Sequence, residues 1–93
     1  MRVLLVTFSI YVPWVHSLKE KRSECKKLIH GLQKKFNASV VESGTQEIHQ
    51  TITLSIATIV FNTAQLSKFE ESFSKFIQQN TQGEILHQER DVF

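Results

Sequence analysis

The chain has 93 residues, enough for one small domain with a modest core that needs neither disulfides nor metal ions. Its 41% hydrophobic and 22% charged residues are those of an ordinary soluble globular protein, and its net charge is only +2. Cys25 is the single cysteine, which excludes an intrachain disulfide and a zinc site built on paired cysteines, and which fits a reduced cytoplasmic compartment.

Residues 2–11 are predicted to form the first strand. Four apolar side chains alternate on one of its faces: Leu4, Val6, Phe8 and Ile10. The opposite face is also largely apolar, and a strand of this kind is usually central in its sheet. Pro13 ends the strand pairing. Residues 1–17 match a secretory signal poorly, and no stretch is long enough to span a membrane, so we interpret the segment as a buried strand of a cytoplasmic protein.

Residues 17–36 are predicted to form the first helix. Ser17 and Glu20 have the S-x-x-E spacing of a capping box. Apolar residues recur at helical spacing and mark the buried side: Leu18, Cys25, Leu28, Ile29, Leu32 and Phe36. Asn37 is a typical C-terminal stop. Because Cys25 lies on the buried side, we interpret it as a small core residue and not as a nucleophile.

A short strand over residues 38–43, which ends near Gly44, and a long strand over residues 49–61 are predicted to pair as a hairpin. The long strand alternates between two faces. One face is apolar and has Ile52, Leu54, Ile56 and Val60, and the other has Thr51, Thr53, Ser55 and Ala57.

Asn62 or Thr63 is predicted to cap a second helix that runs to about Gln79. Its buried side has five apolar residues: Leu66, Phe69, Phe73, Phe76 and Ile77. The last strand is expected from Glu84 to Phe93.

The predicted order, β-α-β-β-α-β, is that of a single ferredoxin-like α+β domain over residues 1–93, with a four-stranded antiparallel sheet and both helices on one face. The first and third strands are expected at the centre. The open face of the sheet then presents Val3, Leu5, Thr7, Ser9 and Tyr11 beside Thr51, Thr53, Ser55, Ala57 and Ile59. Such a face can be left in water, covered by a second copy, or used for a ligand.

The fold alone does not define a function, because many functions use it. RNA-recognition modules of this topology stack bases on aromatic residues of the first and third strands, and the open face of the third strand has no aromatic residue in its middle. Recognition of single strands by stacking is therefore disfavoured. The loop VPWVHS after the first strand has neither the glycine nor the arginine of an acylphosphatase phosphate cradle.

The first helix is basic. Residues 19–35 contain seven lysine and arginine residues against two glutamates, a net charge of +5 that leaves −3 for the rest of the chain. The candidate anion- or nucleic-acid-binding residues are His16, Ser17, Lys19, Lys21, Arg22, Lys26 and Lys27. The alternative is a solvated face that keeps the protein soluble, with Glu20 and Glu24 paired to neighbouring cations. On charge alone the two interpretations are close.

Two weaker patterns involve histidine. His16 is either a phosphate-binding or acid–base group, or it packs back onto the first helical turn, which we favour because no partner base or nucleophile is evident. Glu42 and His49 could meet across the hairpin as metal ligands, but two ligands without a third are weak support. We favour a polar hairpin tip for Glu42, Gln46 and His49, and we expect no metal, no cofactor and no catalytic activity.

The stretch PWVHSLKEKR, followed by LIHGLQKKFNASVVE and by glutamines at 46 and 50, resembles the DUF503 or YlxP-like family, a group of small bacterial proteins of unknown function. The likeness is sharpest over HSLKEKR. A second block uses Phe36, Asn37, Ser39, Val40, Glu42, Gln46 and Gln50. The chain differs at His49, where the family usually has an aromatic residue, and at Thr51, where it usually has a basic one.

The resemblance implies a ferredoxin-like fold, a bacterial cytoplasmic protein, and genes that often neighbour those of translation and ribosome maturation. We therefore expect a non-enzymatic module that contacts RNA or a ribosomal particle through the basic first helix. Lys19, Lys21 and Arg22 would contact phosphates, and Lys26 and Lys27 would extend the patch. His16 and Ser17 would position the start of the helix. The alternative is a dimeric module for a small ligand or a protein partner that uses the open sheet face.

Overall fold

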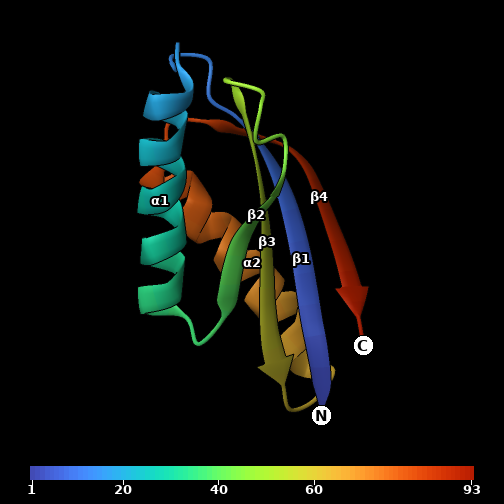
Figure 1. The fold of residues 1–93 in the computed structure, drawn as a ribbon. Helices are drawn as coiled ribbons and strands as arrows, with labels where there is room; N and C mark the ends of the chain where they lie inside the picture. Colours follow the sequence, from blue (N-terminus) through green and yellow to red (C-terminus); the bar gives the residue numbers. More distant parts are fainter.

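Two helices cover one face of a four-stranded antiparallel sheet, and the other face of the sheet is open (Figure 1). The computed structural model describes all of residues 1–93. The elements are β1 (Arg2–Tyr11), α1 (Leu18–Lys35), β2 (Ser39–Gly44), β3 (Thr51–Val60), α2 (Ala64–Asn80) and β4 (Glu84–Val92). The strand order is β2-β3-β1-β4. This arrangement confirms the predicted ferredoxin-like class and the central position of the first and third strands.

The core lies between the sheet and the helices. β1 and β3 pair along their full length, from Arg2 opposite Val60 to Tyr11 opposite Thr51. Alternate residues of both strands are fully buried: Leu4, Val6, Phe8, Ile10, Ile52, Leu54, Ile56 and Val60. The helices contribute Cys25, Leu28, Leu32, Phe73 and Ile77. The predicted alternation of the two central strands is therefore confirmed.

The helix ends follow their local sequence with one exception. Ser17 is the N-cap of α1, and its Oγ accepts a hydrogen bond from the backbone N–H of Glu20 at 3.1 Å, as the S-x-x-E spacing predicts. At the other end, Phe36 leaves the helical conformation. The exception is Thr63, which precedes α2 without a side-chain capping bond. Neither helix is long and apolar enough to cross a membrane.

The hairpin between β2 and β3 differs most from the predicted boundaries. Residues 45–50 form a loop, because β2 ends at Gly44 and β3 begins at Thr51. The pairing register shifts between Glu42 and Gly44, and Thr45 has a φ of 58°, a left-handed conformation that breaks the strand. The loop lies beside the β1–α1 loop, at the end of the sheet opposite the two chain termini (Figure 1).

The open face of the sheet has the predicted residues. Val3 lies opposite Ile59 and Tyr11 lies opposite Thr51, with only small or apolar uncharged pairs between them. Ile59 is 64% exposed, which is unusual for an isoleucine within a strand. Charge appears on this face at β4, where Glu89 pairs with Thr7 in the register.

Candidate nucleic-acid interface

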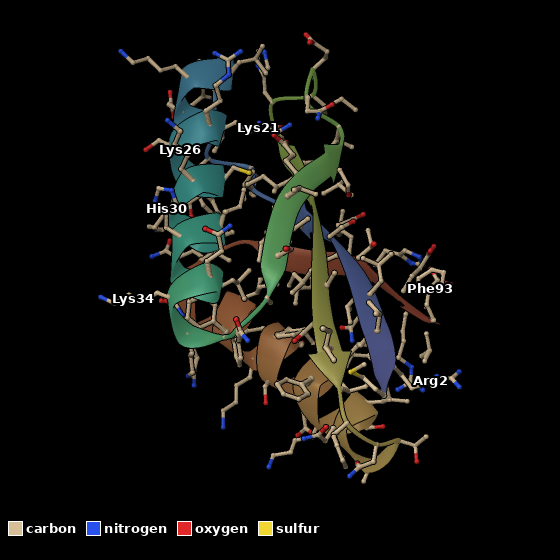
Figure 2. All side chains as sticks on the ribbon, turned by 60° about the horizontal axis from the view of Figure 1, so that its bottom comes forward. Arg2, Lys21, Lys26, His30, Lys34 and Phe93 are labelled. Atoms are coloured by element: carbon tan, nitrogen blue, oxygen red, sulfur yellow. The ribbon has the colours of Figure 1, made fainter.

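α1 presents a row of basic side chains on the face turned away from the sheet. Five exposed residues recur every three or four positions and define the basic stripe: Lys19, Arg22, Lys26, His30 and Lys34. At 1.5 Å per residue the stripe runs about 22 Å along the helix axis. Figure 2 shows Lys26, His30 and Lys34 along this outer side of α1.

Sequence reasoning missed two members of the stripe. They are His30 and Lys34, which are absent from the predicted contact residues. Both follow Lys26 at intervals of four residues, which places them on the same side of a helix. That spacing was visible in the sequence and predicts the longer stripe.

Carboxylates neutralise little of the stripe. Lys27 lies beside it, and its Nζ is 3.4 Å from Glu24 Oε1. No carboxylate lies within ion-pair distance of the lysine and arginine side chains of the stripe itself. The interpretation in which Glu20 and Glu24 pair with the cations of the helix therefore holds for Lys27 alone.

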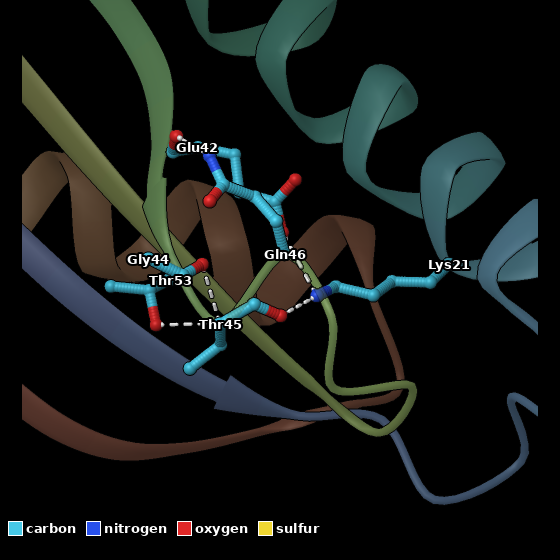
Figure 3. Close-up of polar contacts among 6 residues, drawn as sticks. All are labelled: Lys21, Glu42, Gly44, Thr45, Gln46 and Thr53. Carbon is cyan, nitrogen blue, oxygen red and sulfur yellow. Dashed lines mark hydrogen bonds and ion pairs between the residues drawn. The ribbon is translucent and has the colours of Figure 1, made fainter.

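Lys21 points in the opposite direction, toward the hairpin. Its side chain is 2% exposed, and its Nζ lies 3.0 Å from Glu42 Oε2 and donates to the backbone carbonyl of Thr45 (Figure 3). The prediction that Lys21 lies on the solvated face is wrong, and a buried, paired ammonium is not free to contact a phosphate. The reason is helical spacing, because Lys21 precedes the buried Cys25 and Leu28 by four and seven residues.

The contacts of Lys21 join α1 to the hairpin. Thr45, in its left-handed conformation, donates through Oγ1 to the carbonyl of Gly44 at 2.6 Å, and the same Oγ1 lies 2.9 Å from Thr53 Oγ1. Glu42 Oε2 is buried and makes no hydrogen bond, and the ammonium of Lys21 is its ion-pair partner. Lys21 therefore has a structural role in holding the bulged hairpin against α1.

Cys25 is a core residue, as predicted. It is 4% exposed, and the pKa of its thiol is raised from 9.0 to about 11. Burial is the largest cause of this rise in pKa, the charge of Glu42 adds to it, and the charge of Lys21 opposes it. A thiol with a raised pKa is a poor nucleophile at neutral pH, because the thiolate is the reactive form.

The β1–α1 loop and the hairpin loop are tied together by Gln50, whose Nε2 donates to the carbonyls of Pro13 at 2.9 Å and Val15 at 3.3 Å. His16 and His49 line a hollow of about 290 Å³ between these loops. His16 is exposed, whereas Val15, the residue before it, is buried.

The hairpin residues do not form the metal-ligand pair that the spacing allowed. Glu42 pairs with Lys21 instead, and His49 faces the hollow beside His16. No group of three or more histidine, cysteine, aspartate or glutamate side chains is placed to hold a metal ion. Gln46 donates to the carbonyl of Glu42 at 3.3 Å within the same turn.

The fold and this surface define a small ferredoxin-like α+β protein with a basic outer helix. A family model described as "Protein of unknown function (DUF503)" matches residues 3–90, and the chain belongs to that family. The chain is also similar to the uncharacterized protein YlxP of Bacillus subtilis (strain 168), with 36% identity over 61 residues. The alignment covers 66% of this chain and 66% of YlxP.

Proposed function

We propose that this protein is a cytoplasmic, non-enzymatic module that contacts RNA, as part of a ribosomal particle, through the basic stripe of α1. The observation that supports the proposal most is the row of exposed side chains that no carboxylate neutralises. Lys19, Arg22, Lys26 and Lys34 contact phosphates in this proposal, and Lys27 adds charge beside them. Lys21 is removed from the predicted set.

The geometry suits a backbone contact. Successive members of the stripe are separated by about one helical turn, or about 5 Å along the axis, so several of them can meet phosphates of one strand or of two strands across a groove. Neutralisation of about four phosphates gives a steep salt dependence, with a slope of log K against log salt near −3. Base specificity is not expected, because phosphate contacts do not distinguish sequences.

His16 and Ser17 position the start of the helix in this proposal. The hydroxyl of Ser17 is already used by the N-cap bond to Glu20, so Ser17 acts through the helix and not on the ligand. His16 is exposed next to the cap and is free to contact a phosphate beside Lys19.

The test is filter binding of ribosomal subunits and bulk RNA to the wild type and to the triple variant Lys19→Glu/Arg22→Glu/Lys26→Glu. We expect the affinity for subunits to fall at least about tenfold, because the variant loses three phosphate contacts. Its binding should also depend less steeply on salt concentration. The control variant, Arg2→Glu/Lys68→Glu/Lys75→Glu, changes the net charge equally at exposed positions away from the stripe. Equal losses in both variants, or no loss in either, contradict the proposal.

A second candidate function is a homodimer formed through the open sheet face. The observation in its favour is the uncharged surface over β1 and β3, with Ile59 64%, Val3 38% and Tyr11 37% exposed. Analytical ultracentrifugation at high micromolar concentration tests it. A dimer that the Ile59→Lys variant dissociates supports this function, and a strictly monomeric wild type rejects it.

A further inference from the structure

A second hollow lies at the opposite end of the sheet from the hairpin loop, where β2 begins. β2 starts at Ser39, opposite Ala57, so the last residues of β3 extend beyond it without a strand neighbour on that side. The resulting hollow of about 670 Å³ is the edge hollow. Six apolar residues line it: Val3, Phe36, Ala38, Ala57, Ile59 and Phe69. Its volume is within the range of small-molecule sites.

The walls of the edge hollow are held in place by packing and hydrogen bonding. Phe36 meets the ring of Phe73 edge to face, with the centroids 4.9 Å apart and the planes at 88°. Thr58 is 8% exposed and its Oγ1 donates to the carbonyl of Asn37 at 3.0 Å. The hydroxyl of Thr58 is thus satisfied within the protein, and the wall is mixed, because the polar residues Asn37 and Ser39 line it beside the apolar ones.

Lys35 is the one charged residue of the edge hollow. Its Nζ lies 5.9 Å from the centroid of the Phe36 ring and 5.7 Å from that of Phe76, and no carboxylate pairs with it. A smaller adjoining hollow shares Lys35 and Phe36 and adds Lys75, again without an acidic residue. The mouth therefore has a positive charge next to a partly apolar wall.

We propose that the edge hollow is a binding site for a small organic monoanion with an apolar body, such as an aromatic carboxylate. The body lies along the free edge of β3, with the exposed side chain of Ile59 on the open-face side and Phe36 and Phe69 on the helix side, and the carboxylate pairs with the ammonium of Lys35. An unpaired cation beside the apolar part of the wall offers such a ligand a charge partner and a surface for its hydrocarbon. This site is independent of the basic stripe and of the RNA proposal.

The experiment uses 1-naphthoate as the anion and 1-naphthalenemethanol as a neutral analogue of similar shape, each titrated into the full chain and followed by amide chemical shifts. We expect saturable binding of 1-naphthoate, with the largest shifts at residues 35–39 and 57–59. The neutral analogue should bind about three- to fivefold more weakly, the range of one partly exposed ion pair. Equal affinity of the two compounds, shifts elsewhere, or no saturation by about 5 mM overturns the proposal.

Matched variants locate the site. Lys35→Gln should lower the affinity for 1-naphthoate about three- to fivefold and leave that for the alcohol unchanged, whereas Lys34→Gln, at the adjacent exposed lysine, should change neither. Ala57→Phe fills the edge hollow and should abolish binding, while Thr51→Phe places the same ring on the same face of β3 away from it. Unchanged binding in Lys35→Gln or Ala57→Phe, with both proteins folded by their amide spectra, overturns the assignment.

Discussion

Two lysines of the same short segment have opposite roles. Lys19 is exposed at the start of the basic stripe, and Lys21, two residues later, is buried against Glu42. The difference arises because two residues turn a helix by about 200°, which carries the side chain from the solvent face to the core face. The local density of positive charge therefore overstates the number of groups free to bind an anion.

The buried ion pair leads to a prediction about stability. Lys21→Met leaves the Glu42 carboxylate without a partner, and we expect a loss of about 3 kcal/mol in the free energy of unfolding. The double variant Lys21→Met/Glu42→Leu should recover most of this loss, because an apolar pair needs no compensation. Urea denaturation measures both. Lys26→Met, on the solvent face, is the control and should change the stability by less than about 0.5 kcal/mol.

Cys25 leads to a prediction about alkaline pH. Its pKa is raised from 9.0 to about 11, so the folded protein keeps the thiol proton to a higher pH than the unfolded chain does. Below pH 9 the thiol is protonated in both states and does not reduce the free energy of unfolding. As the pH rises toward 11, the unfolded chain loses this proton more readily than the folded protein does, and the free energy of unfolding falls. Denaturation of the wild type and of Cys25→Ala at pH 8 and pH 10.5 tests it. The wild type should lose more stability than the variant over this interval, and parallel losses would contradict the assignment.

At the scale of elements, the last strand depends on a close backbone approach. A Cβ added at Gly83 would lie 2.7 Å from the carbonyl oxygen of Tyr11 and 3.0 Å from Ile10 Cγ2, so the start of β4 can pass the end of β1 only with glycine. Gly44 differs, because the nearest atom to an added Cβ is 3.8 Å away. Gly44 can therefore serve as the control for a substitution of Gly83, because only Gly83 has a backbone atom too close for a Cβ.

We predict that Gly83→Ala destabilises the protein by about 1–3 kcal/mol, because a backbone carbonyl cannot move aside as the end of a side chain can. Gly44→Ala should change the stability by less than about 1 kcal/mol. Thermal denaturation followed by circular dichroism compares them. If the two variants lose the same stability, contact with Tyr11 does not determine the effect.

For the whole molecule, the distribution of charge matters more than its sum. The net charge is +2, yet the outer face of α1 is basic and β4 contributes Glu84, Glu89 and Asp91 at the other side of the sheet. A polyanion should therefore approach from the helix side only.

This orientation gives a footprinting prediction. Acetylation of lysines, mapped by mass spectrometry with and without bound RNA, should show protection of Lys19, Lys26 and Lys34 and no protection of Lys68, which is exposed on α2. Lys21 should react slowly in both samples, because it is buried. Protection of Lys68 equal to that of Lys26 would show that the binding surface is not the stripe.

The sequence by itself determined the order of the elements, the alternation of β1 and β3, and the N-cap at Ser17, because each depends on residues that are close in the chain. The resemblance of HSLKEKR to a family was equally local, and the family match confirms it.

Only the tertiary structure decided which charges remain free and where the chain leaves a hollow. Lys21 meets Glu42 across 21 positions of the sequence, and the edge hollow joins residues of β1, β3 and both helices with the segment that leads into β2. Helical periodicity shows which side of α1 faces inward, but not which residues of the other elements contact that side. Contacts between distant residues depend on how the elements pack, and no pattern within one element contains that information.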